Sequence, residues 1–191
     1  MNSHIKSIVL AVLFLFSTAP TYADFSGPYA VGNWTQTVDG GSINTGGAPG
    51  SVSLTSSDVG GGTPTNASSQ VFTIAAVADG LVSFDWAYKT SDSLGPSFDP
   101  FDFLLNASFQ QLSDDFGADE QNGSFSWPVS AGDVFGFRAF SQDSCCGPAT
   151  TEVSNFTAPV PEPEIYAMMG MGLGLLGWLG RRKKLKEAAA A

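Results

Sequence analysis

Histidine and cysteine are scarce in this sequence of 191 residues. The single histidine, His4, lies in an N-terminal segment that we expect to be removed. The mature chain would then have no imidazole, which excludes histidine-based catalytic triads and histidine-ligated zinc. The two cysteines, Cys145 and Cys146, are too few for a zinc site built of thiolates.

Positive charge is nearly absent from the middle of the chain. Between Asp24 and Val160 only Lys89 and Arg138 are basic, against 15 acidic residues, so this stretch carries a net charge of −13. A surface of that sign repels phosphate backbones. We therefore expect no nucleic-acid partner.

The first 23 residues have the parts of a secretory signal peptide. Lys6 supplies the positive charge at the start of the segment. Residues 8–16 form an apolar run that is shorter than a membrane-spanning helix requires. Small residues stand at positions −3 and −1 of a cut before Asp24. Residues 1–23 are therefore predicted to direct export and to be removed by signal peptidase. The alternative is an uncleaved anchor helix.

The other end of the chain combines a polar motif, an apolar stretch and a basic cluster. The two prolines of Val160-Pro161-Glu162-Pro163 keep the motif extended and delay the start of a helix. Residues 165–180 are apolar and would be roughly 24 Å long as a helix. This is short for a bilayer core of about 30 Å, a mismatch that snorkelling of flanking basic side chains can offset.

A basic cluster follows the apolar stretch and consists of Arg181, Arg182, Lys183 and Lys184. The positive-inside rule places this cluster in the cytoplasm and the middle of the chain outside. Residues 185–191 are then a short cytoplasmic tail. The apolar stretch is thus predicted to be a transmembrane helix with a basic stop.

In this order of features, residues 160–184 resemble the PEP-CTERM sorting signal of Gram-negative bacteria. The resemblance rests on Pro161-Glu162-Pro163, on the Gly- and Met-rich apolar stretch and on the Arg-rich end, and an N-terminal signal peptide strengthens it. It implies tail removal by exosortase, a transpeptidase-like membrane enzyme, and association with extracellular polysaccharide or biofilm matrix. The alternative is a plain tail anchor without processing.

Short segments of alternating polarity, separated by Gly, Ser, Asn and Asp clusters, fill residues 24–159. In residues 81–90 every second side chain from Val82 to Tyr88 is apolar, which predicts a half-buried strand. Residues 123–129 repeat the pattern. Residues 134–141 are apolar on both faces, which predicts a central strand. Weaker strands are predicted at residues 31–38, 51–55, 70–76, 101–105, 108–112 and 151–157.

About nine short strands predict one all-β domain over residues 24–159, a two-sheet sandwich of jelly-roll type. Between Asp24 and Val160 lie 13 of the 15 phenylalanines, enough aromatic area to build a core without disulfides. The sandwich is expected between the N-terminal signal helix and the C-terminal transmembrane helix.

Several aspartates gather between Asp85 and Asp102, and Asp143 lies in a later loop. Calcium needs six to eight hard oxygen ligands, which loop carboxylates and carbonyls can supply. The hypothesis is a structural Ca²⁺ site made by Asp92, Asp99, Asp102 and Asp143. No D-x-D-x-D-G spacing is present, so the alternative is a set of solvated and turn-capping aspartates. No other cofactor is expected.

Exposed aromatic side chains often contact sugar rings in sandwich domains, and Trp34, Trp86, Trp127 and Tyr88 are the candidates. Trp86 and Tyr88 share the apolar face of one strand, so we expect them in the core. Trp34 follows Gly32 and Asn33 and is the preferred candidate for a sugar contact.

The adjacent Cys145 and Cys146 either close a vicinal disulfide, which stiffens a loop through an eight-membered ring, or remain two thiols. In a secreted chain they could also pair between molecules. A catalytic thiol is not expected, because no histidine base is available.

Paired carboxylates can hydrolyse glycosides without histidine. The adjacent pairs are Asp114-Asp115 and Asp119-Glu120. Neighbouring loop residues rarely face a common substrate, so the pattern does not favour an enzyme. The sequence predicts a non-enzymatic exported protein of the cell surface or extracellular matrix, associated with exopolysaccharide. The alternative is a carbohydrate-binding module of the same matrix.

Overall fold

The computed structural model describes residues 22–161 and 169–178. The signal peptide up to residue 21, Glu162 and Pro163 of the sorting motif, and the basic stop at residues 181–184 lie outside the described residues. Residues 169–178 form a helix. In the part of the chain that the structure describes, no helix is both long and apolar enough to cross a membrane.

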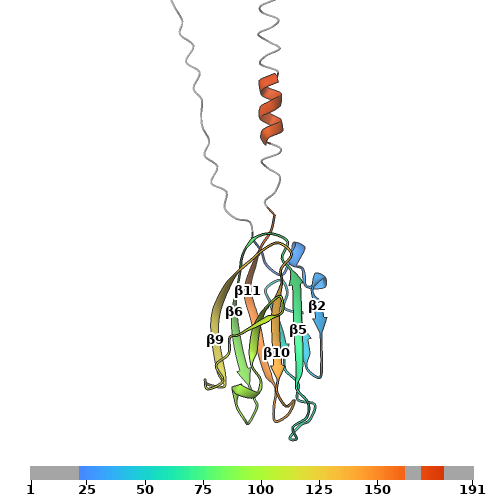
Figure 1. The fold of residues 1–191 in the computed structure, drawn as a ribbon, viewed down its shortest axis with the longest axis vertical. Coiled ribbons are helices and arrows are strands. Elements are labelled where there is room, and N and C mark those ends of the chain that lie inside the picture. The colour runs from blue at the N-terminus through green and yellow to red at the C-terminus, as the bar shows by residue number, and fades with distance from the viewer. Residues whose placement is uncertain (1–21, 162–168, 179–191) are drawn as a thin grey trace, which may run out of the picture.

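Two antiparallel sheets face each other and form a sandwich, as predicted (Figure 1). The first sheet, named here the β6 sheet, has the order β3 (Ser42–Asn44), β4 (Ser51–Thr55), β11 (Ala149–Pro159), β6 (Gly80–Thr90) and β9 (Glu120–Val129), and β1 (Tyr22–Ala23) pairs with β11. The second, the β10 sheet, has the order β2 (Thr35–Thr37), β5 (Ser68–Ala75), β10 (Val134–Ser141), β7 (Phe101–Leu105) and β8 (Ser108–Gln111). Three short 3₁₀ helices lie in the connections: η1 (Gly27–Tyr29), η2 (Val31–Asn33) and η3 (Pro96–Phe98).

Alternation along the two long inner strands builds the core. In β6 the side chains from Val82 to Tyr88 alternate between buried and outward-facing, which is the predicted pattern. β10 lies between β5 and β7, so the prediction of a central strand is confirmed. Phe84 of β6 meets Phe137 of β10 edge-to-face, with ring centroids 4.9 Å apart, and this contact joins the two sheets.

The first predicted strand is shorter than expected, and two edge strands were missed. Residues 31–38 were predicted to be extended, but Val31–Asn33 is the 3₁₀ helix η2 and only Thr35–Thr37 is a strand. The polar edge strand β3 and the two-residue β1 carry no alternating pattern that sequence could show.

The two ends of the sandwich differ. At one end β1 pairs with the last residues of β11, so the first and last described strands of the sandwich meet there (Figure 1). A cut before Asp24 would remove β1. The chain would then begin one residue before Phe25, a buried side chain that stacks on Phe156 with ring centroids 4.5 Å apart. The opposite end, named here the distal end, carries the loops at residues 56–67, 91–100 and 142–148.

Candidate functional site

A groove runs along the edge where β8 and β9 leave the sandwich open, and we name it the edge groove. It has a volume of about 280 Å³. Its lining residues carry no charge and are Phe103, Leu105, Asn106, Ser108, Phe109, Gln110 and Trp127.

Trp127 forms one wall of the edge groove. Its partner in the register is the buried Val82, so the indole faces inward from β9. The indole stacks on Phe125, with ring centroids 5.9 Å apart and planes 5° apart, and Phe125 packs on Phe103. Trp127 is nevertheless 40% exposed, because β9 is an edge strand. The result is a flat aromatic surface, supported from behind and open to solvent.

The side chains of β8 that line the edge groove opposite Trp127 include two polar ones. Phe103 pairs with Gln110 and Leu105 with Ser108, so Gln110 and Ser108 lie on the inward side of β8. Both are exposed, because no further strand covers this edge. An amide and a hydroxyl beside an exposed indole can donate to and accept from hydroxyl groups of a sugar while its ring stacks on the indole.

Asn106 shapes the end of the edge groove rather than offering a free amide. Its Nδ2 donates to Asp133 Oδ1 at 3.1 Å, and its Oδ1 accepts from the Val134 backbone N–H at 3.0 Å. Asn106 has a φ of 54° at the turn between β7 and β8, a conformation that asparagine tolerates well. The turn therefore holds the end of the groove in place.

A larger hollow of about 420 Å³ lies beside η1 and β5. Its lining includes Ile74, Val77 and Val134 but no aromatic ring. The edge groove is thus the better candidate for a ligand that stacks.

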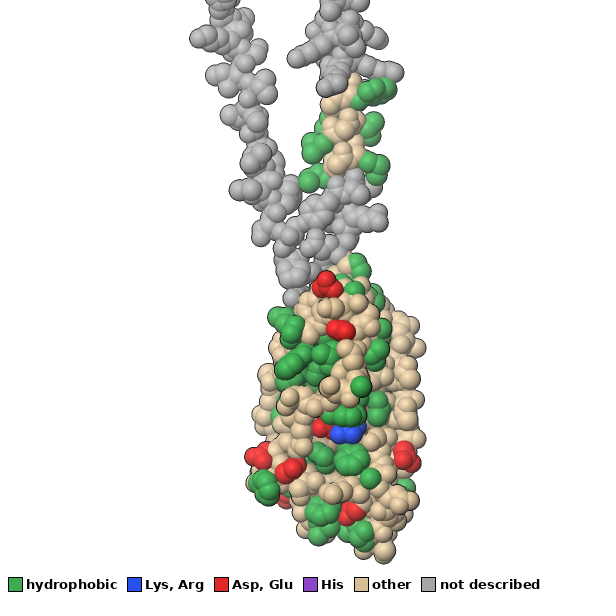
Figure 2. All heavy atoms as spheres, viewed as in Figure 1, with side chains coloured by type: hydrophobic (Ala, Val, Ile, Leu, Met, Phe, Trp, Pro, Cys, Tyr) green, Lys and Arg blue, Asp and Glu red, His purple; other side chains and the backbone are tan. Residues whose placement is uncertain are grey.

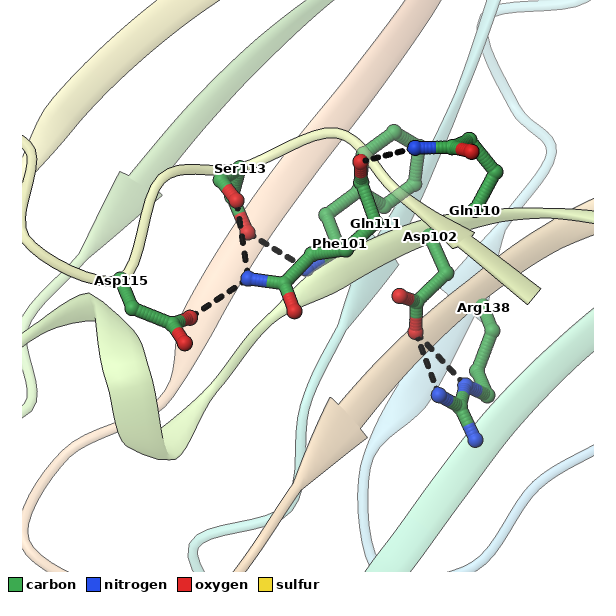
Figure 3. Close-up of polar contacts among 7 residues, drawn as sticks. All are labelled: Phe101, Asp102, Gln110, Gln111, Ser113, Asp115 and Arg138. Atoms are coloured by element: carbon green, nitrogen blue, oxygen red, sulfur yellow. Dashed lines mark hydrogen bonds and ion pairs between the residues drawn. The ribbon is translucent and has the colours of Figure 1, made fainter.

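Asp102 and Arg138 form an ion pair on the outer face of the β10 sheet. Arg138 donates from Nε and from a terminal nitrogen to Asp102 Oδ2, each at 2.7 Å (Figure 3). The guanidinium carbon lies 3.7 Å from the Phe109 ring centroid and 4.9 Å from that of Phe140. In Figure 2 a basic group lies beside an acidic one on this face, with hydrophobic side chains around them.

This pairing corrects one part of the calcium hypothesis. Asp102 points outward from β7 and is held by Arg138, so the prediction that it joins Asp92 and Asp99 in one site is wrong. Burial raises the pKa of Asp102, and the charge of Arg138 acts in the opposite direction.

The other three predicted calcium ligands lie at the distal end. Asp92 follows β6, Asp99 follows η3, and Asp143 lies in the loop before β11. Burial raises the pKa of Asp92, and the nearby charge of Asp143 raises it further. Burial also raises the pKa of Asp99 to about 7, and Asp92 adds to that rise. The structure therefore brings Asp92 and Asp99 together, places Asp143 near Asp92 only, and holds Asp102 apart from them at Arg138.

Cys145 and Cys146 are joined in a vicinal disulfide, one of the alternatives that the sequence left open. The loop is tied to residues 60–65 by backbone hydrogen bonds from Gly60 N to Ser144 O at 2.9 Å and from Thr65 N to Asp143 O at 2.6 Å. The sulfurs lie close to the Asp143 carboxylate. Because they are bonded to each other they are not thiolates, so this trio is not a metal site.

The prediction that Trp34 is exposed and contacts a sugar is wrong. Trp34 is only 6% exposed, stacks on Phe72 with centroids 4.4 Å apart, and donates from Nε1 to the Tyr29 carbonyl at 2.9 Å. The turns of η1 and η2 fold it back between the sheets. Trp86 and Tyr88 are buried, as predicted.

Trp127 was among the candidates but was not singled out, although the sequence held a signal for it. Pro128 follows it directly, and proline inside a strand is confined to sheet edges because it cannot donate to the ladder. An inward-facing aromatic on an edge strand is only partly covered.

Three of the four carboxylates in the two adjacent pairs make local contacts. Asp114 Oδ1 accepts from the Phe116 backbone N–H. Asp115 Oδ1 accepts from Nε2 of Gln111, the last residue of β8 (Figure 3). Glu120 pairs with Lys89 at 2.6 Å on an exposed surface. These contacts hold loops and strand ends in place.

Residues 159–184 match the family model of the PEP-CTERM protein-sorting motif. The chain therefore carries this motif, and the resemblance seen in the sequence at residues 160–184 is confirmed. The motif implies an exported protein that exosortase processes. A search of curated proteins finds no match to this chain.

Solved structures similar to this chain include two carbohydrate binding modules and a third protein. A family 35 carbohydrate binding module from an environmental isolate is 16% identical over 75% of this chain and 99% of its own, with a TM-score of 0.38. A second family 35 module, from Clostridium thermocellum, is 12% identical over 71% of this chain and 98% of its own, with a TM-score of 0.33. A structure described as "CBM4 structure and function" is 14% identical over 72% of this chain and 84% of its own, with a TM-score of 0.30. Likeness at this level assigns no ligand to this chain.

Proposed function

We propose that this protein is exported, sorted through its PEP-CTERM motif, and retained at the cell surface or in the extracellular matrix without catalytic activity. The sorting motif at residues 159–184 carries this proposal. The signal peptide at residues 1–23 delivers the chain to the membrane, and the apolar stretch at residues 165–180 holds it there until exosortase removes the tail.

Intact mass spectrometry of the protein from membrane and medium fractions of its native host tests the sorting. We expect a species that begins at Asp24 and ends near Pro161–Pro163. A chain that keeps Arg181 to Ala191 and occurs only in membranes would mean a plain anchor and would overturn the sorting proposal.

A second function rests on the exposed face of Trp127 in the edge groove. We infer that the sandwich binds a polysaccharide of the matrix there, with one sugar ring stacked on the indole and its hydroxyls bonded to Gln110 and Ser108. The indole already stacks on Phe125, with ring centroids 5.9 Å apart. Because this contact holds the Trp127 side chain in place, little side-chain entropy is lost when a ligand binds.

The charge of the domain selects the class of polysaccharide. The lining residues of the edge groove are uncharged, while residues 24–160 carry a net charge of −13. A chain of uronic acids or sulfated sugars would be repelled at low ionic strength. The proposed ligand is therefore a neutral polysaccharide, bound by stacking and hydrogen bonds.

Affinity electrophoresis of the full chain in gels containing neutral exopolysaccharide from the host tests this function. Trp127→Ala is expected to weaken binding at least tenfold, about 1.4 kcal/mol. The matched control is Phe116→Ala, because Phe116 is 96% exposed and lies outside the groove lining. Equal binding by both variants would exclude the edge groove as the site. Binding only to acidic polysaccharide would exclude a neutral ligand.

A further inference from the structure

Unpartnered polar atoms are concentrated at the distal end of the sandwich. Among the described residues, five buried side-chain oxygens form no hydrogen bond, and four of them belong to Tyr88, Asp92 and Asp99. They are the Tyr88 hydroxyl, Asp92 Oδ2 and both carboxylate oxygens of Asp99. Buried polar groups in native proteins almost always have a hydrogen-bond partner or ligand. These four unpartnered oxygens therefore indicate a binding site.

The two carboxylates are deeply buried and adjacent. Asp99 is 1% exposed and Asp92 is 5% exposed. Each influences the pKa of the other, and Asp58 and Asp143 add further negative charge near Asp92. Asp92 Oδ1 accepts from the Leu94 backbone N–H at 2.6 Å, which fixes the carboxylate and leaves its Oδ2 free.

No basic side chain balances this charge. Residues 22–161 and 169–178 contain only two basic residues. Lys89 pairs with Glu120 at 2.6 Å, and Arg138 pairs with Asp102 at 2.7 Å. An uncompensated pair of buried carboxylates is costly, because desolvation penalises the ionised form of each.

We propose that Asp92 and Asp99 bind a Ca²⁺ ion at the distal end of the sandwich. Their three free carboxylate oxygens are hard anionic ligands of the kind that Ca²⁺ prefers. The hydroxyls of Ser56 and Ser141 lie near Asp99. Ser56 Oγ accepts from the Ala149 backbone N–H at 2.8 Å and Ser141 Oγ from the Ser144 backbone N–H at 3.0 Å, so each oxygen keeps a lone pair for a cation. Water completes a shell of six to eight oxygens.

The bound ion would join the two sheets. Ser56 follows β4 and Asp92 follows β6, both strands of the β6 sheet. Asp99 precedes β7 and Ser141 ends β10, both strands of the β10 sheet. A cation held by all four fastens the loops of the distal end to one another, at the end opposite the sorting motif.

Thermal unfolding of the full chain, followed by tryptophan fluorescence near pH 7.5, tests this site. Wild type is compared in EDTA, in millimolar CaCl₂ and in MgCl₂ of equal ionic strength. We expect Ca²⁺ to raise Tm by roughly 5–10 °C when its concentration is about 100-fold above Kd. Mg²⁺ should raise Tm much less, because it demands a tighter and more regular shell.

Asp99→Asn is the test variant and Glu152→Gln the matched control. Both lose one carboxylate, but Glu152 lies exposed on the outer side of β11. Asp99→Asn should lose the Ca²⁺-dependent rise in Tm and should be at least as stable as wild type in EDTA, because a buried negative charge is gone. Glu152→Gln should keep the rise.

The proposal is overturned if wild type unfolds at the same temperature in EDTA and in Ca²⁺, which would mean that a proton satisfies the pair. It is also overturned if Asp99→Asn keeps the full rise or if Mg²⁺ equals Ca²⁺. Should Asp99→Asn not fold, calcium bound per chain is measured after gel filtration of wild type and Asp92→Asn, with one ion and none expected. Polysaccharide binding through Trp127 is scored separately and stands or falls independently.

Discussion

Asp102 and Arg138 meet across β7 and β10 as a largely buried ion pair, with Arg138 also stacked on Phe109. The guanidinium donates from two nitrogens to one carboxylate oxygen, each at 2.7 Å. It lies 3.7 Å from the Phe109 ring centroid, a distance typical of a cation–π contact. One of the two basic residues in the domain is therefore used to neutralise a buried aspartate.

Removal of Arg138 should be strongly destabilising. Arg138→Met leaves the Asp102 carboxylate buried without its cation, and breaking a buried pair in this way costs about 3–5 kcal/mol. The double variant Arg138→Met with Asp102→Leu should recover most of that loss, because both charges are gone. Urea unfolding of the two variants measures the difference, and a loss below about 1 kcal/mol in the single variant would show that the pair is effectively solvated.

Trp34 and Trp127 should differ in what they contribute to stability. Trp34→Ala opens a cavity between stacked rings in the core, and such a truncation costs about 3–5 kcal/mol. Trp127→Ala removes a ring that is 40% exposed, so it should cost about half as much or less. Urea midpoints of the two variants check this order, and equal losses would contradict the burial described for Trp34.

The central strands could be predicted from sequence because burial leaves a regular trace there. Alternation from Val82 to Tyr88 follows from one face of β6 lying on the core. β10 lies between β5 and β7, and its outward-facing Arg138 and Phe140 are half-buried. Edge strands such as β3 lack this constraint, since neither of their faces must be apolar.

The candidate site was harder to predict, because exposure depends on how the chain folds in three dimensions. Trp34 follows a Gly-Asn pair typical of loops, but two 3₁₀ turns bring it back into the core. Trp127 lies in an alternating pattern in which it takes the position of a core residue. It is exposed only because β9 is the last strand of its sheet. Asp92 and Asp99 were identified from residue type, whereas the separation of Asp102 from them depends on its contact with Arg138.

The vicinal disulfide should add little to global stability. A disulfide stabilises mainly by restricting the unfolded chain, and the effect grows with the length of the loop that it closes. Cys145 and Cys146 are neighbours, so almost no loop is closed. The double variant Cys145→Ala with Cys146→Ala should unfold within about 1 kcal/mol of wild type in urea. A loss of several kcal/mol would mean that the disulfide holds the distal loops in place.

Asp133 should make stability depend on pH on the acidic side. Its carboxylate accepts from the Ser130 backbone N–H at 2.8 Å and from Asn106 at 3.1 Å, and these hydrogen bonds lower its pKa in the folded chain. Asp133 therefore contributes stability that is present above the pKa of the unfolded chain, about 4, and is lost as pH falls through the lower folded value.

Comparison of wild type with Asp133→Asn isolates this contribution. The difference in Tm should be largest near pH 6 and should shrink steadily as the pH falls below about 4, because wild type then loses its charged hydrogen bonds too. Asp85→Asn should behave in the same direction, since hydrogen bonds from Asn155 and Ser124 lower the pKa of Asp85. A difference that stays constant with pH would mean that Asp133 acts only through the shape of its turn. In that case the end of the edge groove would be held by Asn106 and the backbone of Val134, without any contribution from charge.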